Sequence, residues 1–178
     1  FQICAPADSL ELTSQLKDAL LNGIPTYIRI GKKGEPILHH KDSVLRIGKA
    51  KELVRGESIA LIGVGPILSE ALKANEILMS QGINISIVSM GSIKPLDEQF
   101  LQDLINRGFS KWISLEEHNK IGGLGSALLE WLSEKQINST SLIRMGINDH
   151  FVNHLGNQTY VRQMENLDHE SIVKLIKK

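Results

Sequence analysis

The stretch Ile113-Ser-Leu-Glu-Glu-His-Asn-Lys-Ile-Gly-Gly-Leu-Gly-Ser-Ala-Leu-Leu129 decides the fold of this chain. It begins as an apolar strand, continues through Glu116, Glu117 and His118, and turns at a group of glycines before an amphipathic helix starts. In an open α/β sheet, residues that follow a strand and precede a helix lie at the carboxyl edge, where ligands and partners usually bind. We therefore expect this stretch to lie at a functional edge of a parallel sheet.

The same order of strand and helix recurs along the chain after Gly56. Continuous apolar runs predict buried strands, and apolar residues at helical spacing predict helices between them. The expected strands are 59–64, 83–89, 112–115 and 142–145, and the expected helices carry apolar stripes over 67–78, 100–105, 124–132 and 172–176. Such alternation is typical of a three-layer α/β/α fold in which helices cover both faces of a mostly parallel sheet.

The first 56 residues differ from this pattern and divide into two parts. Within 1–30, Asp8 and Glu11 predict a helix start of the capping-box type, and Thr26–Ile30 predicts a strand. Residues 31–56 are polar and have no sustained period, so we expect a linker, with a short strand near 44–47. A chain that opens inside a strand is expected to be cut from a longer protein.

Composition favours a globular protein and excludes several functional classes. Of the 178 residues, 42% are hydrophobic and 22% are charged, and 20 Lys and Arg balance 20 Asp and Glu. This balance gives no electrostatic argument for binding nucleic acid or an anionic membrane, and no apolar run is long enough to predict a membrane span. The single cysteine, Cys4, cannot form an internal disulfide, which suits a reducing cytoplasm.

Glu116, Glu117 and His118 are the first candidates for a site. One histidine beside two carboxylates is a poor set of metal ligands, and successive residues at a strand end point to opposite faces. The two glutamates are therefore not expected to share a catalytic centre. We expect one of them to cap the glycine turn or to contact a neighbouring subunit.

The glycines at 122, 123 and 125 allow two interpretations. A glycine turn at a helix N-terminus can bind phosphate through free N–H groups. The sequence here matches neither common phosphate-binding pattern, and the preceding carboxylates would repel an anion. The favoured interpretation of Gly122, Gly123 and Gly125 is a tight turn that lets the helix approach the sheet.

Arg29 is the candidate for ligand binding, because it interrupts an otherwise apolar strand. At a strand end its guanidinium could hold a phosphate or carboxylate with two hydrogen bonds, although a solvated edge arginine is the alternative. No nucleophile–base signature is visible. The histidines lack metal-site spacing and are expected to be structural or exposed; they are His39, His40, His118, His150, His154 and His169.

Taken together, these segments resemble the C-terminal part of the transketolase family, whose members depend on thiamine diphosphate. Ala5–Asp8 with Glu11 and Pro25–Gly34 resemble the last helix and strand of the family's pyrimidine-binding domain. Gly91–Asp97 contains the "KPLD" of the C-terminal domain. The decisive stretch carries its "EEH" and "GGLGS", and Gly146–Phe151 with Gly156 fits its closing "G…D.F…G" run.

The resemblance implies a domain organisation and a function. Residues 1–30 would be a remnant of the pyrimidine-binding domain, 31–56 a linker, and 57–178 a transketolase C-terminal domain. The parent would transfer a two-carbon or acyl unit, with thiamine diphosphate and Mg²⁺ bound outside this chain. This part alone would be non-catalytic and would support a homodimer, together with the rest of the parent or an N-terminal partner subunit.

Two alternatives remain open at this point. One is a free-standing α/β module that binds a ligand or partner at the edge formed by 116–126. Within the family, a transketolase-like split subunit is favoured over a deoxyxylulose phosphate synthase or a pyruvate dehydrogenase beta subunit. In deoxyxylulose phosphate synthases the arginine that matches Arg29 contacts substrate phosphate. Gly31, Lys32 and Lys33 depart from the pattern that follows this arginine there.

Overall fold

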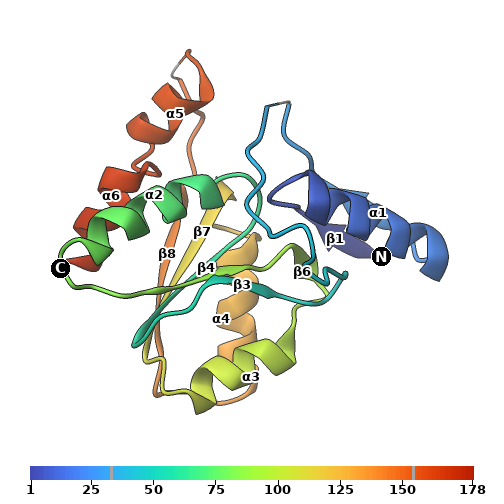
Figure 1. Cartoon of the computed structure of the whole chain (residues 1–178), viewed down its shortest axis with the longest axis horizontal. Helices are drawn as coiled ribbons and strands as arrows, with labels where there is room; N and C mark the ends of the chain where they lie inside the picture. The colour runs from blue at the N-terminus through green and yellow to red at the C-terminus, as the bar shows by residue number, and fades with distance from the viewer. Residues whose placement is uncertain (33, 154) are drawn as a thin grey trace.

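The computed structural model describes residues 1–32, 34–153 and 155–178, so Lys33 and His154 lie outside the described residues. The strands are β1 (Gln2–Cys4), β2 (Thr26–Ile28), β3 (Lys51–Val54), β4 (Ile59–Gly63), β5 (Ser86–Ser89), β6 (Ser92–Lys94), β7 (Lys111–Asn119) and β8 (Ser141–Ile147). The helices are α1 (Ser9–Asn22), α2 (Leu68–Met79), α3 (Glu98–Asn106), α4 (Leu124–Glu134), α5 (Gln158–Met164) and α6 (His169–Ile176). Figure 1 shows their arrangement.

The main sheet has five strands in the order β3-β5-β4-β7-β8. The four strands β5, β4, β7 and β8 run parallel, and β3 pairs antiparallel with β5 at one edge. This confirms the mostly parallel sheet. The parallel register brings the carboxyl ends of β4 and β7 to the same edge, because Gly63 lies opposite Leu115.

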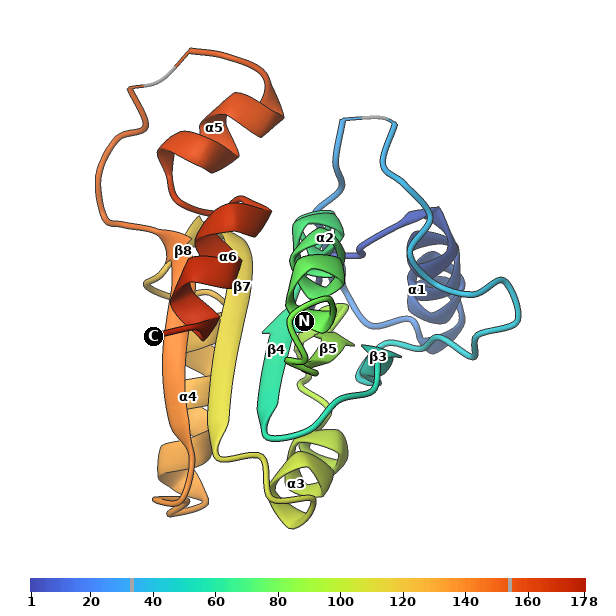
Figure 2. The same ribbon diagram turned by 60° about the vertical axis from the view of Figure 1, so that its left-hand side comes forward.

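Helices cover both faces of this sheet, which confirms the three-layer α/β/α architecture (Figure 2). On one face, α2 and α6 bury a cluster that includes Leu61, Ile113 and Ile172. On the other face, α3 and α4 enclose a second cluster around Trp112 and Trp131, whose rings stack with centroids 6.2 Å apart. The strands have continuous apolar runs because their side chains are buried on both faces of the sheet.

Strand β7 is longer than the sequence predicts. The apolar pattern ends at Leu115, but pairing with β8 resumes after an irregularity and Asn119 lies opposite Ile147. Glu116, Glu117 and His118 therefore lie inside the strand and not after it. Their side chains alternate between the faces of the sheet, as the pleat requires.

A second, smaller sheet joins the N-terminal part to the rest of the chain. Its order is β2-β1-β6, with β1 parallel to β2 and antiparallel to β6. The sequence does not predict β6, because this strand has only three residues and no period. Helix α1 covers this sheet with a polar face, because Glu11 and Gln15 are buried while Leu16 is half exposed.

The start of α1 has the predicted cap, with one difference. Asp8 accepts a hydrogen bond from Glu11 N–H at 2.9 Å. Glu11 reaches back to Ala7 N–H at 2.7 Å, one residue earlier than in a standard capping box. Gly23 ends the helix in the left-handed conformation, with φ of 66°.

The short strand predicted near 44–47 is wrong. Residues 44–47 form no strand, because hydrogen bonds to α1 use their backbone groups. Ser14 Oγ donates to the carbonyl of Leu45, and Asp18 Oδ2 accepts from Ile47 N–H at 2.9 Å. The strand of this segment is β3, which completes the main sheet.

Candidate functional site

Glu116 is buried at the carboxyl end of β7 and binds the start of α4. Its Oε2 accepts from Leu124 N–H and its Oε1 accepts from Gly125 N–H, both at 2.8 Å. Burial raises the pKa of Glu116, and the two N–H donors partly oppose this rise. The carboxylate thus satisfies two N–H groups that the first turn of a helix leaves free.

The glycines of the turn are required by close approach and by backbone conformation. A Cβ atom on Gly123 would lie 1.9 Å from Glu116 Oε2, and one on Gly125 would lie 2.7 Å from Ser114 Oγ. Gly122 has a φ of 77°, which side chains rarely tolerate. Because Glu116 occupies the N–H groups at the start of the helix, this turn presents no free phosphate cradle at Leu124 and Gly125.

His118 lies on the same face of β7 as Glu116 and is half exposed. Its Nδ1 is 2.8 Å from the carbonyl oxygen of Asn119 and 3.9 Å from Glu116 Oε2. The ring therefore sits at the surface of the glycine turn. Nothing in the described part of the chain pairs it with Glu117.

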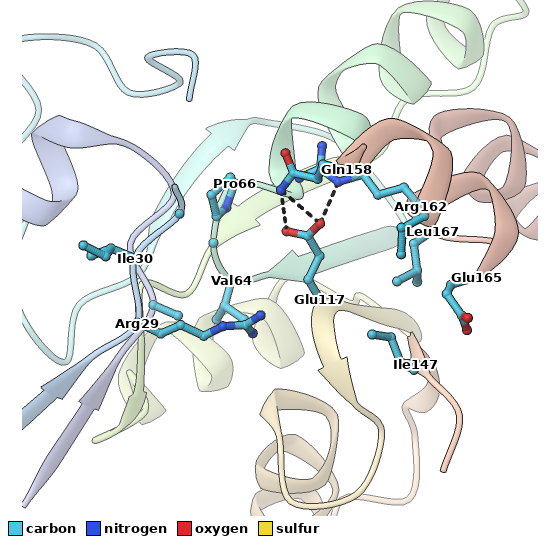
Figure 3. A pocket seen from close by; sticks show the side chains of 14 residues that line it. Arg29, Ile30, Val64, Pro66, Glu117, Ile147, Gln158, Arg162, Glu165 and Leu167 are labelled. Carbon is cyan, nitrogen blue, oxygen red and sulfur yellow. Dashed lines mark hydrogen bonds and ion pairs between the residues drawn. The ribbon is translucent and has the colours of Figure 1, made fainter. Parts of the chain in front are cut away.

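Glu117 points to the opposite face and meets helix α5 (Figure 3). Its Oε1 is 2.8 Å from Arg162 Nε, and its two oxygens lie 3.3 and 3.4 Å from Gln158 Nε2. Arg162 is 7% exposed, and Glu117 holds it between β7 and α5. The two glutamates, although adjacent in sequence, serve different elements.

Arg162 connects Glu117 to a second buried carboxylate, that of Glu70 on α2. Arg162 Nη1 lies 3.7 Å from Glu70 Oε1, and Glu70 also accepts from Lys73 Nζ at 2.7 Å and pairs with His169 Nδ1 at 2.8 Å. Burial alone would raise the pKa of Glu70, but hydrogen bonds from Lys73 and His169 outweigh burial and lower that pKa. The network links α2, α5, α6 and β7.

Arg29 lies directly after β2 and lines the same pocket as Glu117 and Arg162. Figure 3 shows its side chain extending into this pocket from the N-terminal part of the chain. The pocket has a volume of about 260 Å³. Its lining residues are Ala5, Arg29, Ile30, Gly31, Val64, Gly65, Pro66, Glu117, Ile147, Gln158, Val161, Arg162, Glu165 and Leu167.

This pocket is the candidate site, because it brings together residues that are distant in the sequence. It lies at the carboxyl end of β4, next to Gly65 and Pro66 before α2. The Arg29 guanidinium has no hydrogen-bond or ion-pair partner among the residues that the structure describes, and it is exposed. A free guanidinium at such an edge can bind a phosphate or a carboxylate.

Gln158 and Arg162 are pocket residues that the sequence did not single out. They lie on α5, a helix of seven residues whose apolar pattern is too short to predict it. The signal that could have found α5 is its cap, because the Asn157 side chain accepts from Tyr160 N–H at 2.9 Å.

Two other types of function have no support in the geometry. Within 1–32, 34–153 and 155–178, no three His, Cys, Asp or Glu side chains gather where they could hold a metal ion. None of the described helices is both long enough and apolar enough to span a membrane.

The fold is that of an α/β domain, and residues from this domain and from the N-terminal segment together line the candidate pocket. Residues 48–172 match the family model "Transketolase, C-terminal domain". The chain belongs to this family and is the C-terminal, transketolase-like part of a larger family protein.

Relatives of two kinds match almost the whole chain. It is 34% identical to the 1-deoxy-D-xylulose-5-phosphate synthase of Aquifex aeolicus, covering 98% of this chain and 28% of that protein. It is also 34% identical to a transketolase C-terminal section from Methanocaldococcus jannaschii, covering 98% of this chain and 54% of that protein. Sequence identity does not separate the two kinds. The chain spans about half or less of the length of these relatives.

Solved structures show the same architecture. A split-gene transketolase, described as an inactive beta4 tetramer, superposes with a TM-score of 0.89 at 29% identity, covering 99% of this chain and 56% of that one. The transketolase of Campylobacter jejuni superposes with a TM-score of 0.68 at 17% identity, covering 99% of this chain and 26% of that one, which supports the fold alone. The match over the full chain includes the N-terminal part as well as the main sheet.

Proposed function

We propose that this chain is the C-terminal part of an enzyme that transfers a two-carbon or acyl unit with thiamine diphosphate. Membership of the family and the relatives at 34% identity support this proposal. The proposed organisation is a pyrimidine-domain remnant over 1–30, a linker over 31–56 and the C-terminal domain over 57–178. The parent is proposed to be a cytoplasmic homodimer, formed with the rest of the protein or with an N-terminal partner subunit.

Thiamine diphosphate and Mg²⁺ are proposed to bind outside this chain. The described residues include no group of three His, Cys, Asp or Glu side chains that could hold the ion, which supports this part of the proposal. We expect the 178-residue chain to bind no thiamine diphosphate when titrated calorimetrically in the presence of Mg²⁺. A micromolar dissociation constant would contradict this assignment.

The role proposed for this chain is to bind an anionic group of the substrate through Arg29. The observation that carries this role is the free Arg29 guanidinium in a pocket at the carboxyl edge of the sheet. The deoxyxylulose phosphate synthase relatives favour a phosphorylated substrate. A bidentate arginine–phosphate contact is strong and depends on geometry, so it would contribute to specificity.

The test is Arg29→Ala in the reassembled enzyme, assayed with a phosphorylated substrate and its unphosphorylated analogue. Loss of a charge-assisted contact costs roughly 1.5–3 kcal/mol, so kcat/KM for the phosphorylated substrate should fall about ten-fold to a hundred-fold. The unphosphorylated analogue should be affected far less. Arg29→Lys is the matched control, because it keeps the charge and loses the planar fork.

Stability should change little, since Arg29 is exposed. Equal losses with both substrates would show that Arg29 supports the structure and not the substrate. Unfolding of the Arg29→Ala protein would have the same meaning.

A further inference from the structure

The candidate pocket contains a charge that could block its own anion site. Glu117 and Arg29 line the same pocket from different parts of the chain, and Figure 3 shows both side chains directed into it. A carboxylate and a guanidinium that share a pocket attract one another. If Glu117 were free to move, its carboxylate would compete with any anionic ligand for Arg29.

Arg162 removes this competition in the observed structure. Its Nε holds Glu117 Oε1 at 2.8 Å, and Gln158 Nε2 supports both oxygens from the same helix. Arg162 is itself fixed by burial and by Glu70, 3.7 Å from its Nη1. The Glu117 carboxylate is therefore compensated by a partner that cannot easily leave.

The other acidic residue of the pocket lining also has a partner close to its carboxylate. Glu165, which lines the pocket, is 3.2 Å from His150 Nε2. Arg162 Nη2 is buried and has no hydrogen-bond partner in the described part of the chain. The guanidinium of Arg162 thus has donor capacity left beyond Glu117, and among the described lining residues Arg29 is the exposed cation.

We propose that Arg162 is a positioning residue that holds Glu117 away from Arg29 and keeps Arg29 open to an anionic group of the substrate. The proposal rests on the proposed function of Arg29. In this proposal, the ion pair between Arg162 and Glu117 contributes to specificity for anionic substrates. Neither residue needs to contact the ligand. Without Arg162, the Glu117 carboxylate would pair with the Arg29 guanidinium inside the pocket and neutralise its charge.

The test uses inorganic phosphate as the probe and the 178-residue chain. Phosphate is titrated while the side-chain Nε–H signal of Arg29 and the backbone N–H signals of the pocket residues are followed by NMR, in the wild type, Arg162→Met, Glu117→Gln and the double variant. In Arg29→Ala, the backbone signals alone report binding. We expect Arg162→Met to weaken phosphate binding about tenfold, and the double variant to return to within about threefold of the wild type. Arg162→Lys, which keeps the charge, should retain most of the affinity.

Glu117→Gln provides a second variant for the test in case Arg162→Met does not fold. Removing the carboxylate leaves two cations near the ligand, so Glu117→Gln should bind phosphate at least as tightly as the wild type, by up to about tenfold. A folded Arg162→Met protein with normal affinity would overturn the proposal. Failure of the double variant to recover, or weaker binding by Glu117→Gln, would do the same.

The outcomes also separate this proposal from the one on which it rests. If phosphate does not move the Arg29 signal in the wild type, or if Arg29→Ala binds phosphate equally well, the anion site at Arg29 fails and this proposal fails with it. If Arg29→Ala abolishes binding while the Arg162 and Glu117 variants behave like the wild type, the anion site stands and only the positioning role of Arg162 is overturned.

Discussion

The carboxylate of Glu116 caps helix α4, because its Oε2 accepts a hydrogen bond from Leu124 N–H at 2.8 Å. The next residue, Glu117, faces the other side of β7 and contacts α5. The pleat of one strand thus gives two neighbouring carboxylates different tasks. Glu116 fixes the glycine turn, while Glu117 belongs to the pocket.

This cap makes Glu116→Gln a destabilising substitution although the side chains have the same shape. The amide has one oxygen, so it can accept from only one of the two N–H groups at Leu124 and Gly125, and its NH₂ would face the other donor. We expect a loss of about 1–2 kcal/mol at pH 7 in urea denaturation. Glu130→Gln, on the exposed side of α4, is the control and should stay within about 0.5 kcal/mol.

The pH dependence gives this prediction a sign. Burial raises the pKa of Glu116 in the folded protein, so the folded state holds the proton more tightly than the unfolded state and the wild type gains stability as the pH falls through that raised pKa. Glu116→Gln cannot titrate at this position. The difference in stability between wild type and Glu116→Gln should therefore grow as the pH falls through the raised pKa towards the ordinary range of a glutamate. A difference that shrinks over this range would show that the folded state favours the ionised carboxylate.

Gly123→Ala should cost more than Gly122→Ala. The new Cβ at 123 would lie 1.9 Å from Glu116 Oε2, which cannot move without losing its bonds to α4, whereas nothing lies within 4 Å of one at 122. In Gly122→Ala the only cost is an alanine in the left-handed conformation, about 1 kcal/mol of stability. Gly123→Ala should lose about 2–4 kcal/mol of stability. Thermal unfolding of the two variants checks the order, and a reversed order would show that the turn rearranges.

Much of the main sheet could be predicted from the sequence, because its strands are buried on both faces. The run 59–64 became β4 and 112–115 became the core of β7, since continuous apolar residues have few other places to go. The shortest elements could not be predicted in this way. β6 has three residues and α5 has seven, and both depend on contacts with distant segments.

The candidate site could be predicted only in its parts. Arg29 stood out because a guanidinium interrupts an apolar run, and Glu116 and Glu117 because they follow one. The sequence does not show that Arg29 and Glu117 share a pocket with Arg162, because Arg162 is 45 residues from Glu117 and no local pattern indicates the pair. The polar face of α1 was missed for the same reason: Gln15 Nε2 donates to the carbonyl of Gly91, far along the chain.

Asp8 should make the protein sensitive to acid. Burial alone would raise the pKa of Asp8, but hydrogen bonds from the His39 ring and from the N–H groups of Glu11, His39 and Leu38 outweigh burial and lower that pKa. A lowered folded pKa means that the stabilisation is present above about pH 4 and is lost as the pH falls below it. Asp8→Asn should cost about 2–3 kcal/mol at pH 7 and progressively less towards pH 2.

Denaturation of wild type and Asp8→Asn at several pH values measures this difference directly. Taking the difference matters, because the nearby Glu11 has its pKa raised by burial and shifts stability in the opposite direction. Asp42→Asn is the control, since Asp42 lies in an exposed pair with His40. Equal losses for Asp8→Asn at pH 7 and pH 2 would show that the hydrogen bonds to Asp8 do not depend on its charge.

A C-terminal domain that begins at residue 57 should be less stable than one that begins at residue 48. A domain that begins at residue 57 would lack β3, which pairs with β5 and packs Leu53 and Val54 against the core. Glu52 within β3 accepts from Ser86 Oγ at 2.6 Å and pairs with Arg107 at 2.8 Å. We expect 57–178 to fold, and 48–178 to be more stable by about 2–4 kcal/mol.

Urea denaturation of the two truncated proteins measures this difference, and limited trypsin digestion of the whole chain gives an independent check. Lys41 is exposed in an irregular segment, so the first cut is expected near it, ahead of β3. Equal urea midpoints for 48–178 and 57–178 would show that β3 adds nothing to the domain. Early cleavage within 57–178, with 31–56 protected, would contradict the proposed linker, because the irregular segment would then be held more firmly than the sheet.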